Sequence, residues 1–443
     1  LTAGSALAAQ GDGGGGAYQV AGDGAALRAS SGNGAAVVRQ GAGASVAPLL
    51  SLGAGSSVSG DEVVLDSTYG MQVDDSVGLT ADRLSMAAGQ VSLVLSPQGA
   101  LAGSVVDPHL VLEADLLSLA SYRSIDVYGD GLFGRSGLGA LVLSAAGLRG
   151  YGQSGAGATF AAGDLFLGNP SGAVMPAAGP VAGGNLVFLA DRSVTLGAND
   201  FALGGFAGTS LVAPGGVVVS GSGALASDGS LTVTAPLVTG ADRASYNVGV
   251  AGDLALVPAG GMAGVAPGLG ATLSLAGRSV TANTLIDLPG GLVSLRATGG
   301  DVNVGGSIAV DGRAVDFHDL TRFAGAGRID LLSETGDVRL AAGSRLTADG
   351  ATGGGDAGTI SLSAAQGEVV ASGLLQARAG GTGAGAGNFV LDARGLPSYA
   401  GLRDILSAGG FTASQSLRLR SGSVVLDGST RVRDFSLAAD GGD

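Results

Sequence analysis

Histidine is the first residue type to consider for chemistry, because it is the commonest general base beside a nucleophile. The 443 residues contain two histidines, His109 and His318. His109 closes an Asp-Pro-His turn sequence, and His318 stands between Phe317 and Asp319, with no catalytic signature around either. The sequence has no cysteine, so a zinc site would lack its usual thiolate ligands. We therefore expect that the protein has no catalytic residue, binds no metal and no cofactor, and is not an enzyme.

Paired carboxylates are a second option, since glycoside cleavage uses two of them, about 5 Å apart for retention and roughly 6.5–9.5 Å apart for inversion. Adjacent residues of a strand point to opposite faces, so the pairs at positions 61–62 and 74–75 would diverge. Glu113 and Asp115 could share one face. No aromatic platform for a sugar lies near them, so a polysaccharide-cleaving β-helix enzyme is an alternative that we do not prefer.

Three acids recur at one position of successive segments, namely Asp301, Asp337 and Glu368. If the segments stack, the carboxylates form a column along one edge, and a column could bind Ca²⁺. Acids beside glycine also form solvated turns whose mutual repulsion is screened by salt. The Gly-Gly-x-Gly-x-Asp calcium repeat is absent. We favour the turn interpretation and leave Ca²⁺ binding open.

The composition narrows the classes of partner and of fold. The formal charge is −14 and all 22 basic residues are arginine, which disfavours nucleic acid as a partner. Hydrophobic residues make up 46% and charged residues 13%, so the chain can bury a core. No run of about 18 apolar residues occurs, so we expect no membrane span. Residue 1 is leucine and no targeting segment opens the sequence, so we interpret the chain as an internal part of a longer protein.

The elements that would position any site are short segments that alternate apolar and polar residues, the pattern of strands with one buried face. Three clear examples begin at Val293, Ile329 and Ile360. Each leads through a turn with Gly and an acid into a second apolar segment; the second segments begin at Val302, Val338 and Val369. A third strand follows in each repeat, so that one repeat is three short strands. Further repeats begin at Leu186, Leu211, Leu231, Leu254, Leu273, Phe389 and Leu417.

A single three-strand repeat cannot bury its apolar side chains, but stacked repeats can, because each strand then pairs with its equivalents at about 4.8 Å. The 85 glycines suit sharp corners, and small aliphatic residues suit a narrow interior. We therefore predict an all-β fold, a parallel β-helix (solenoid) forming an elongated rod, over residues 61–443. Residues 1–60 are expected to be an irregular Gly/Ala-rich leading segment or the first repeats.

Three segments are expected to interrupt the β-helix as insertions. Residues 121–135 and 314–328 concentrate aromatic and acidic residues, and insertions on solenoids often carry the binding surface. Residues 398–411 have apolar residues at helical spacing and predict a short amphipathic helix. Glycine-rich stretches at 352–358 and 380–387 predict extruded, flexible loops. The candidate partner-binding residues are Tyr122, Tyr128, Phe133, Phe317, His318 and Phe323.

The sequence resembles the filamentous haemagglutinin-type exoproteins that Gram-negative bacteria export by two-partner secretion. The likeness rests on residues 121–129, Ser-Tyr-Arg-Ser-Ile-Asp-Val-Tyr-Gly, on residues 231–240, Leu-Thr-Val-Thr-Ala-Pro-Leu-Val-Thr-Gly, and on Ala408-Gly-Gly-Phe411 leading into Leu417-Arg-Leu-Arg. It covers roughly residues 60 to 443. Neither the N-terminal secretion domain of the family nor a C-terminal toxin is recognisable in this sequence.

The resemblance implies a right-handed β-helical fibre that crosses an outer-membrane β-barrel transporter unfolded and is extracellular or displayed on the bacterial cell surface. Members mediate adhesion, aggregation or contact toxicity. Our first hypothesis is a structural shaft of such a fibre or adhesin, and the second is a receptor- or glycan-binding surface on the insertions. The implied partners are the transporter, a host or neighbouring cell surface, and other rods through lateral self-association.

Overall fold

The computed structural model is nearly all β, with 53% of the residues in strands and 3% in helices. The structure describes residues 5–8, 18–32, 37–40, 48–96, 104–106, 114–153, 156–176, 183–422 and 424–441. The strands are short, and most of them pair in parallel with a strand of the preceding or following repeat. The expectation of an all-β fold with parallel sheets is confirmed.

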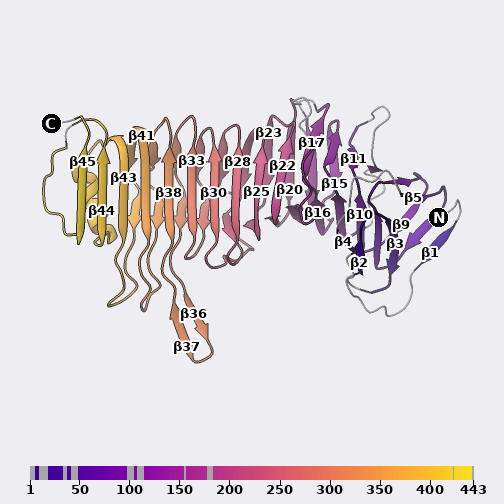
Figure 1. Ribbon diagram of the computed structural model, residues 1–443, viewed down its shortest axis with the longest axis horizontal. Coiled ribbons are helices and arrows are strands. Elements are labelled where there is room, and N and C mark those ends of the chain that lie inside the picture. The colour runs from indigo at the N-terminus through magenta and orange to yellow at the C-terminus, as the bar shows by residue number, and fades with distance from the viewer. Residues whose placement is uncertain are drawn as a thin grey trace. The chain divides into compact units, whose positions relative to one another are not determined.

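The chain divides into two units, which we describe separately. Unit 1 comprises residues 1–212 and 225–229, and unit 2 comprises residues 213–224 and 230–443. Strand β25 (Ser222–Ser227) has residues in both. In each unit, the strand pairings define three parallel sheets, here called the first, second and third sheets. Figure 1 shows the strands of successive repeats side by side.

The strands of unit 1 mostly follow one another in the order first, second and third sheet. The first sheet contains β7 (Glu62–Ser67), β10 (Arg83–Ala88), β13 (Leu116–Ser121), β16 (Ala140–Ser144), β19 (Asp164–Gly168) and β21 (Ser193–Leu196). The second contains β11 (Val91–Val94), β14 (Ile125–Tyr128), β17 (Gly147–Tyr151) and β22 (Asn199–Gly204). The third contains β15 (Gly131–Gly134), β18 (Ala158–Ala162), β20 (Asn185–Ala190) and β23 (Gly208–Val212).

Unit 1 begins with shorter and less regular pairings. The antiparallel strand β3 (Ala25–Ser30) pairs with β7 and ends the first sheet. Parallel pairs join β1 (Ala6–Ala8) to β6 (Ser57–Ser59), β6 to β9 (Gly78–Thr80), β2 (Tyr18–Ala21) to β4 (Val37–Gln40), β5 (Leu49–Leu52) to β8 (Gly70–Val73), and β11 to β12 (Ser104–Val106). Among the described strands, none pairs with the other side of β3, so the first sheet ends there.

In unit 2 the second and third sheets contain more strands than those of unit 1. The first contains β24 (Gly216–Val219), β27 (Leu237–Gly240), β32 (Leu285–Asp287), β35 (Ser307–Ala309), β40 (Arg345–Thr347) and β42 (Leu374–Gln376). The second contains β28 (Ser245–Val250), β30 (Thr272–Gly277), β33 (Leu292–Ala297), β38 (Arg328–Ser333), β41 (Thr359–Ala371), β43 (Asn388–Gly395), β44 (Ser414–Leu419) and β45 (Asp434–Ala439). The third contains β26 (Ser230–Thr234), β29 (Leu254–Val257), β31 (Val280–Ala282), β34 (Val302–Val304), β39 (Val338–Leu340) and the end of β41.

The pairing register of unit 2 is the one that the sequence repeats predict. Val293 pairs with Ile329, Ile329 with Ile360, and Ile360 with Phe389. The second segments align likewise, through the pairs Val302–Val338 and Val338–Val369. Equivalent residues therefore stack directly over one another, which keeps their apolar side chains on one face.

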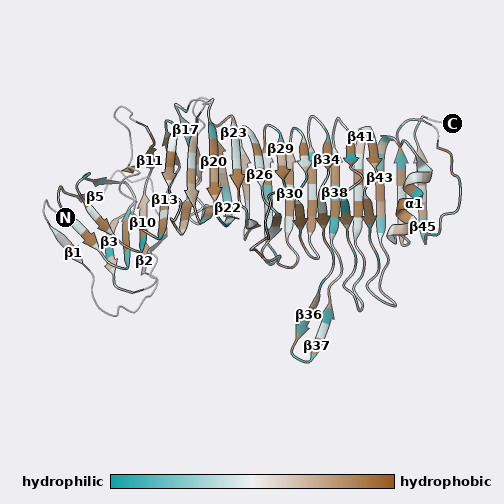
Figure 2. Cartoon of the chain, turned by 180° about the vertical axis from the view of Figure 1, so that it is seen from behind, coloured by the Kyte–Doolittle hydropathy of each residue, from teal (hydrophilic) through white to brown (hydrophobic). Residues whose placement is uncertain are grey.

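Alternate residues of these strands form an aliphatic interior. The inward positions of β33, β38 and β41, such as Leu295, Leu331 and Leu362, are at most 1% exposed, while their neighbours lie at the surface. In unit 1 the interior also takes aromatic rings, because Phe133, Phe160 and Phe188 stack with centroids 5.7 and 5.5 Å apart. Figure 2 shows apolar residues concentrated along the paired strands.

One repeat of unit 2 lacks its first-sheet strand. Strand β27 pairs directly with β32, although two strands of each of the other sheets lie between them in sequence. The residues in that place form an irregular segment, 258–271, whose Gly264 and Gly268 N–H groups donate to the carbonyl oxygens of Gly215 and Gly240 at 2.8 Å each. The first sheet stays continuous, so the stack tolerates a missing strand.

The three expected insertions have different outcomes. Residues 121–135 do not interrupt the repeat, because β14 and β15 within them pair in register with the second and third sheets. Residues 314–328 contain a hairpin of β36 (Ala314–Phe317) and β37 (Leu320–Phe323). The helix predicted over 398–411 is α1 (Tyr399–Gly409), which buries Leu402 and Leu406 and packs against β42.

Candidate binding surface

The hairpin is the most prominent projection of unit 2, and Figure 1 shows it extending away from the sheets. Its strands pair antiparallel, with Phe317 opposite Leu320 and Asp316 opposite Thr321. Opposite residues share a face and neighbouring residues alternate between faces. One face therefore carries Val315, Phe317, Leu320 and Arg322, and the other carries Ala314, Asp316, Thr321 and Phe323.

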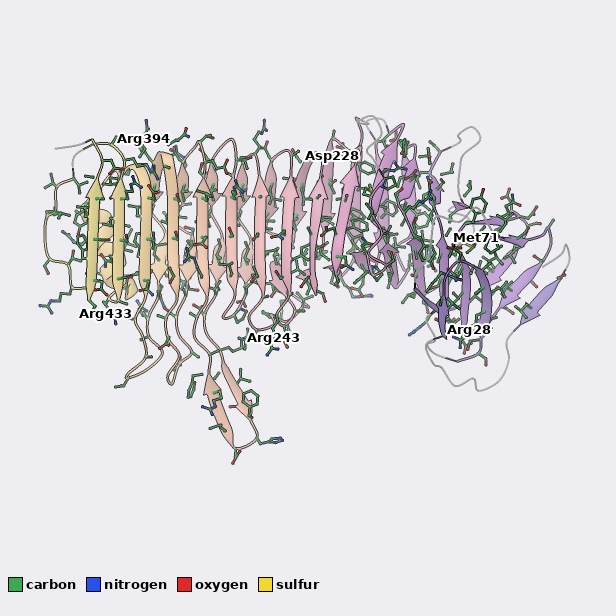
Figure 3. All side chains as sticks on the ribbon, in the orientation of Figure 1. Arg28, Met71, Asp228, Arg243, Arg394 and Arg433 are labelled. Atoms are coloured by element: carbon green, nitrogen blue, oxygen red, sulfur yellow. The ribbon has the colours of Figure 1, made fainter. Side chains whose placement is uncertain are left out.

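The first of these faces has three apolar residues beside Arg322 and is open to solvent. The side chains of Phe317 and Leu320 are 56% and 48% exposed, and side chains stand out on both sides of the hairpin (Figure 3). On the other face, the Thr321 hydroxyl donates to Asp316 Oδ1 at 2.6 Å. A pair of adjacent exposed apolar side chains on a projecting element is a typical protein contact feature. We call Val315, Phe317 and Leu320 the hairpin face.

Phe323 has a different role from Phe317. Its ring lies on the backbone of the neighbouring loop, where a Cβ added to Gly353 would stand 2.4 Å from Cε1 of Phe323. Gly353 also has a φ of +114°, which favours glycine. Phe323, which is 41% exposed, therefore contacts this loop, and Phe317 is the more exposed of the two rings.

Backbone hydrogen bonds join the hairpin base and the two glycine-rich loops that follow it (Figure 1). Ala326 N–H donates to Asp356 carbonyl oxygen at 2.8 Å, and Gly353 N–H donates to Gly380 carbonyl oxygen at 2.7 Å. Ala357 N–H donates to the Gly385 carbonyl oxygen at 2.9 Å. The expected loops at 352–358 and 380–387 are thus extruded, and they support one another side by side.

His318 forms the turn of the hairpin. Its φ of 53° lies in the left-handed region, which histidine adopts more readily than β-branched residues. Its side chain is exposed at the tip of the hairpin. The second histidine, His109, lies outside the described residues.

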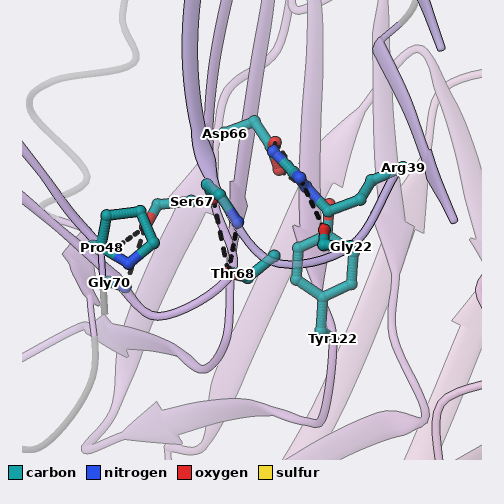
Figure 4. A network of polar contacts seen from close by, with 9 residues as sticks. Gly22, Arg39, Pro48, Asp66, Ser67, Thr68, Gly70 and Tyr122 are labelled. Atoms are coloured by element: carbon teal, nitrogen blue, oxygen red, sulfur yellow. Dashed lines mark hydrogen bonds and ion pairs between the residues drawn. The ribbon is translucent and has the colours of Figure 1, made fainter. Parts of the chain in front are cut away.

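Tyr122 belongs to a buried polar network near the start of unit 1 (Figure 4). Its hydroxyl donates to Asp66 Oδ1 at 2.7 Å, and Arg39 Nε donates to Asp66 Oδ2 at 2.9 Å. Arg39 Nη1 also donates to the Gly22 carbonyl oxygen at 2.8 Å. Burial raises the pKa of Tyr122 above its usual range, and the hydrogen bond to Asp66 adds to this shift. Tyr122 is therefore engaged in joining early strands together.

Tyr128 lies on the outer side of the second sheet of unit 1. Its ring stacks on that of Tyr151, with centroids 5.0 Å apart and planes 14° apart, and the Arg149 guanidinium lies 5.5 Å from the Tyr151 centroid. Asp126 beside them accepts hydrogen bonds from Gln90, Ser124 and Arg149. Partial burial raises the pKa of Tyr128.

Phe133 is fully buried and stacks with the other aromatic rings inside unit 1. It does not reach the surface, because it occupies an inward position of β15. Of the six candidate residues, the structure groups Phe317, His318 and Phe323 on one hairpin and leaves the other three in separate places. Leu320 completes the hairpin face and was not singled out from the sequence. Its place opposite Phe317 depends on where the hairpin turns, which the sequence pattern does not give.

The acid column is present and has a structural role. Asp301 Oδ1 accepts the N–H of Asp337 at 2.8 Å, and Asp337 Oδ1 accepts the N–H of Glu368 at 2.7 Å. A Cβ on Gly336 or Gly367 would stand 2.3 or 2.5 Å from the carboxylate of the preceding repeat. The glycine before each acid thus makes room for the carboxylate below it. Within the described part of the chain, no group of three or more metal-ligating side chains is found.

Of the two residues named for polysaccharide cleavage, Asp115 is exposed and Glu113 lies outside the described ranges, so that alternative stays a prediction. Across the same ranges, no helix combines the length and the hydrophobicity that crossing a membrane requires. No protein-family model, curated protein or solved structure matches the chain.

Proposed function

We propose that the chain is a right-handed parallel β-helix that forms a shaft segment of a large secreted or surface-displayed bacterial fibre. The observation that carries this proposal is the register of unit 2, in which Val293, Ile329, Ile360 and Phe389 pair in turn along the second sheet. A stack of this kind gives stability through contacts between neighbouring repeats and requires no cofactor. The handedness, the export through a partner transporter and the bacterial surface location come from the resemblance.

The contacts between repeats suit a load-bearing segment. Carboxylates of one repeat accept main-chain N–H groups of the next, as Asp349 does from Arg378 at 2.6 Å. Exposed arginines bridge repeats in the same way, as Arg192 does with Asp164 and Arg420 with Asp392. Each ion pair contributes about 0–1 kcal/mol to the free energy of unfolding, so their effect depends on how many of them follow one another along the stack.

Electron microscopy of the purified chain tests the shaft proposal. We expect thin particles much longer than they are wide, because about 4.8 Å of length is added per repeat. A compact globular particle would contradict it. A density map at side-chain detail would also decide the handedness.

A second function, binding of a cell-surface receptor or glycan, is favoured by the exposure of Phe317 and Leu320 on the hairpin face. The double change of Phe317→Ala and Leu320→Ala should reduce attachment of the protein to target cells. The matched control is Leu285→Ala, since Leu285 is 38% exposed on β32 and lies outside the hairpin. Equal attachment of the double variant and the control variant would exclude the hairpin face as the contact.

A further inference from the structure

The third sheet of unit 1 has an apolar outer face. Its strands β15, β18, β20 and β23 pair in register, so their outward residues form two rows across the sheet. One row is Leu132, Thr159, Val187 and Ser210, and the other row is Gly134, Ala161, Leu189 and Val212. We call these eight residues the unit 1 face.

The unit 1 face is open to solvent. Leu132 and Leu189 are 54% and 42% exposed, and Val187 and Val212 are partly exposed. In proteins, parallel sheets are normally covered on both faces. Here the inner face packs into the core, whereas the outer face leaves neighbouring leucine and valine side chains in contact with water. Apolar side chains gathered in this way indicate a surface for association.

The unit 1 face carries no charged side chain, although the whole chain has a formal charge of −14. The outward positions of the other two sheets of unit 1 differ. They include Asp164 in the first sheet and Asp126 with Arg149 in the second. Two copies of an acidic chain repel each other least where neither presents a charge. Of the three outer sheet faces of unit 1, the uncharged one therefore opposes a second copy least.

The two rows are complementary in size to themselves when the order of the strands is reversed. A two-fold axis along the strands, between β18 and β20, places β15 over β23 and β18 over β20 of a second copy. Each large side chain then faces a small residue. The four pairs are Leu132 with Ser210, Val187 with Thr159, Leu189 with Ala161, and Val212 with Gly134. Contacts of large on small residues let two sheets interdigitate at a spacing of about 10 Å.

We propose that the unit 1 face binds the same face of a second copy, with the repeats of the two copies running in opposite directions. The contact is isologous, so it closes as a dimer. The acids that flank the face do not oppose one another. Asp130 falls opposite Gly208 of the second copy, and Asp191 falls opposite Gly163.

The dimer has a consequence for the fibre, and this step rests on the proposed function. Copies that run in opposite directions join shafts that approach each other from opposite sides. The contact would therefore link fibres of two facing cells, and each further pair of shafts would add to the avidity of the link.

Sedimentation equilibrium of the purified chain tests the contact. We expect a weak dimer, with a dissociation constant on the order of micromolar, because a face of four strands is smaller than a standard interface. Leu189→Arg places a charge at the centre of the contact and should raise the dissociation constant at least about tenfold. The control is Leu285→Arg, since Leu285 is 38% exposed on β32 and lies outside the face. A wild-type protein that stays monomeric, or equal weakening by the two changes, would contradict the proposal.

Crosslinking tests which residues meet, because the chain has no cysteine and any introduced thiol is unique. Copies carrying Leu132→Cys are mixed with copies carrying Ser210→Cys and treated with a short bis-maleimide. We expect about tenfold more crosslinked dimer in this mixture than in either variant alone. In the proposed dimer, like thiols lie three strand spacings apart, at about 14 Å, whereas the unlike thiols face each other.

Two results of the crosslinking would overturn the proposal. No crosslinked dimer in the mixture would mean that the two faces do not meet. Equal crosslinking of Leu132→Cys alone would mean that the copies run in the same direction, because that arrangement brings the two Leu132 positions together. Electron microscopy separates this proposal from the shaft proposal, since elongated particles that never pair would leave the shaft intact and exclude the dimer.

Discussion

At the scale of single residues, Gly336 and Gly367, which precede Asp337 and Glu368, are explained by a carboxylate of the preceding repeat. Asp301 and Asp337 each occupy the space that a side chain at Gly336 or Gly367 would need. The acid of one repeat and the glycine of the next therefore form a single contact. The glycine leaves room for the carboxylate, which accepts a main-chain N–H group of the next repeat. This contact satisfies a polar group that would otherwise face a corner of the stack.

Gly367→Ala should lower the free energy of unfolding by about 1–3 kcal/mol, because the new Cβ meets Asp337 Oδ1 and the Gly336 carbonyl oxygen. Gly343→Ala is the control, since no atom lies within 4 Å of the added Cβ, and it should be neutral or stabilising by about 0.4–1 kcal/mol. Urea denaturation of both variants measures the difference. Equal stabilities would show that the carboxylate moves aside freely.

Asp253 gives a prediction for pH. Hydrogen bonds from Arg278 and Ser279 lower its pKa to about 2. A carboxylate with a lowered pKa adds stability that is fully present above its unfolded pKa of about 3.9 and is lost as the pH falls through the folded value. Because the pair is largely exposed, the contribution is below about 1 kcal/mol. The stability difference between wild type and Asp253→Asn should therefore narrow from pH 5 to pH 2 in urea denaturation, and a constant difference would contradict this.

At the scale of elements, the hairpin is anchored on one face and open on the other. An isolated two-stranded hairpin is marginally stable in water, so contacts with the neighbouring loop matter. Phe323 supplies such a contact through its ring on Gly353, whereas Phe317 has no comparable cover. Phe323, which the sequence suggests as a binding residue, thus helps to position Phe317, which is free to bind a partner.

Phe323→Ala should increase amide hydrogen exchange across β36 and β37, because the hairpin loses its contact with the loop. Phe317→Ala is the matched control and should leave exchange in these strands nearly unchanged. Mass spectrometry of peptides that cover residues 310–328 measures both. If Phe317→Ala has the larger effect, the assignment of the two faces is reversed.

The sequence predicted the elements well where its repeats are regular. The starts at Val293, Ile329 and Ile360 give the correct strands and the correct register, because alternation with short turns leaves one way to bury each apolar face. Residues 121–135 were misread as an insertion. Their acids and aromatics are unusual in composition, yet Asp126 is neutralised by Arg149 and Phe133 packs inward, so the strands remain regular.

The candidate surface was harder to predict than the strands. Phe317 and Phe323 are equally aromatic, and the pairing that separates them onto two faces depends on a turn at His318 with a positive φ. Similarly, the contact of Tyr122 with Asp66 joins residues 56 positions apart. Such contacts arise from stacking of repeats and leave no local pattern in the sequence.

At the scale of the whole molecule, the charge of −14 and the absence of lysine set the solution behaviour. The protein should be least soluble near its isoelectric point of about 4.4, where repulsion between copies vanishes. Light scattering across pH 3 to 8 measures this. A turbidity maximum well away from pH 4.4 would show that specific contacts, and not net charge, govern association.

The repeat in which β27 pairs with β32 has a broader consequence. A stack that stays continuous when one strand is omitted does not depend on a fixed number of residues per turn, so the chain can gain or lose material at its corners while its neighbours keep their alignment. Such a corner is therefore a suitable site for inserting a foreign epitope. Related sequences with this architecture can vary there while the paired strands keep their register.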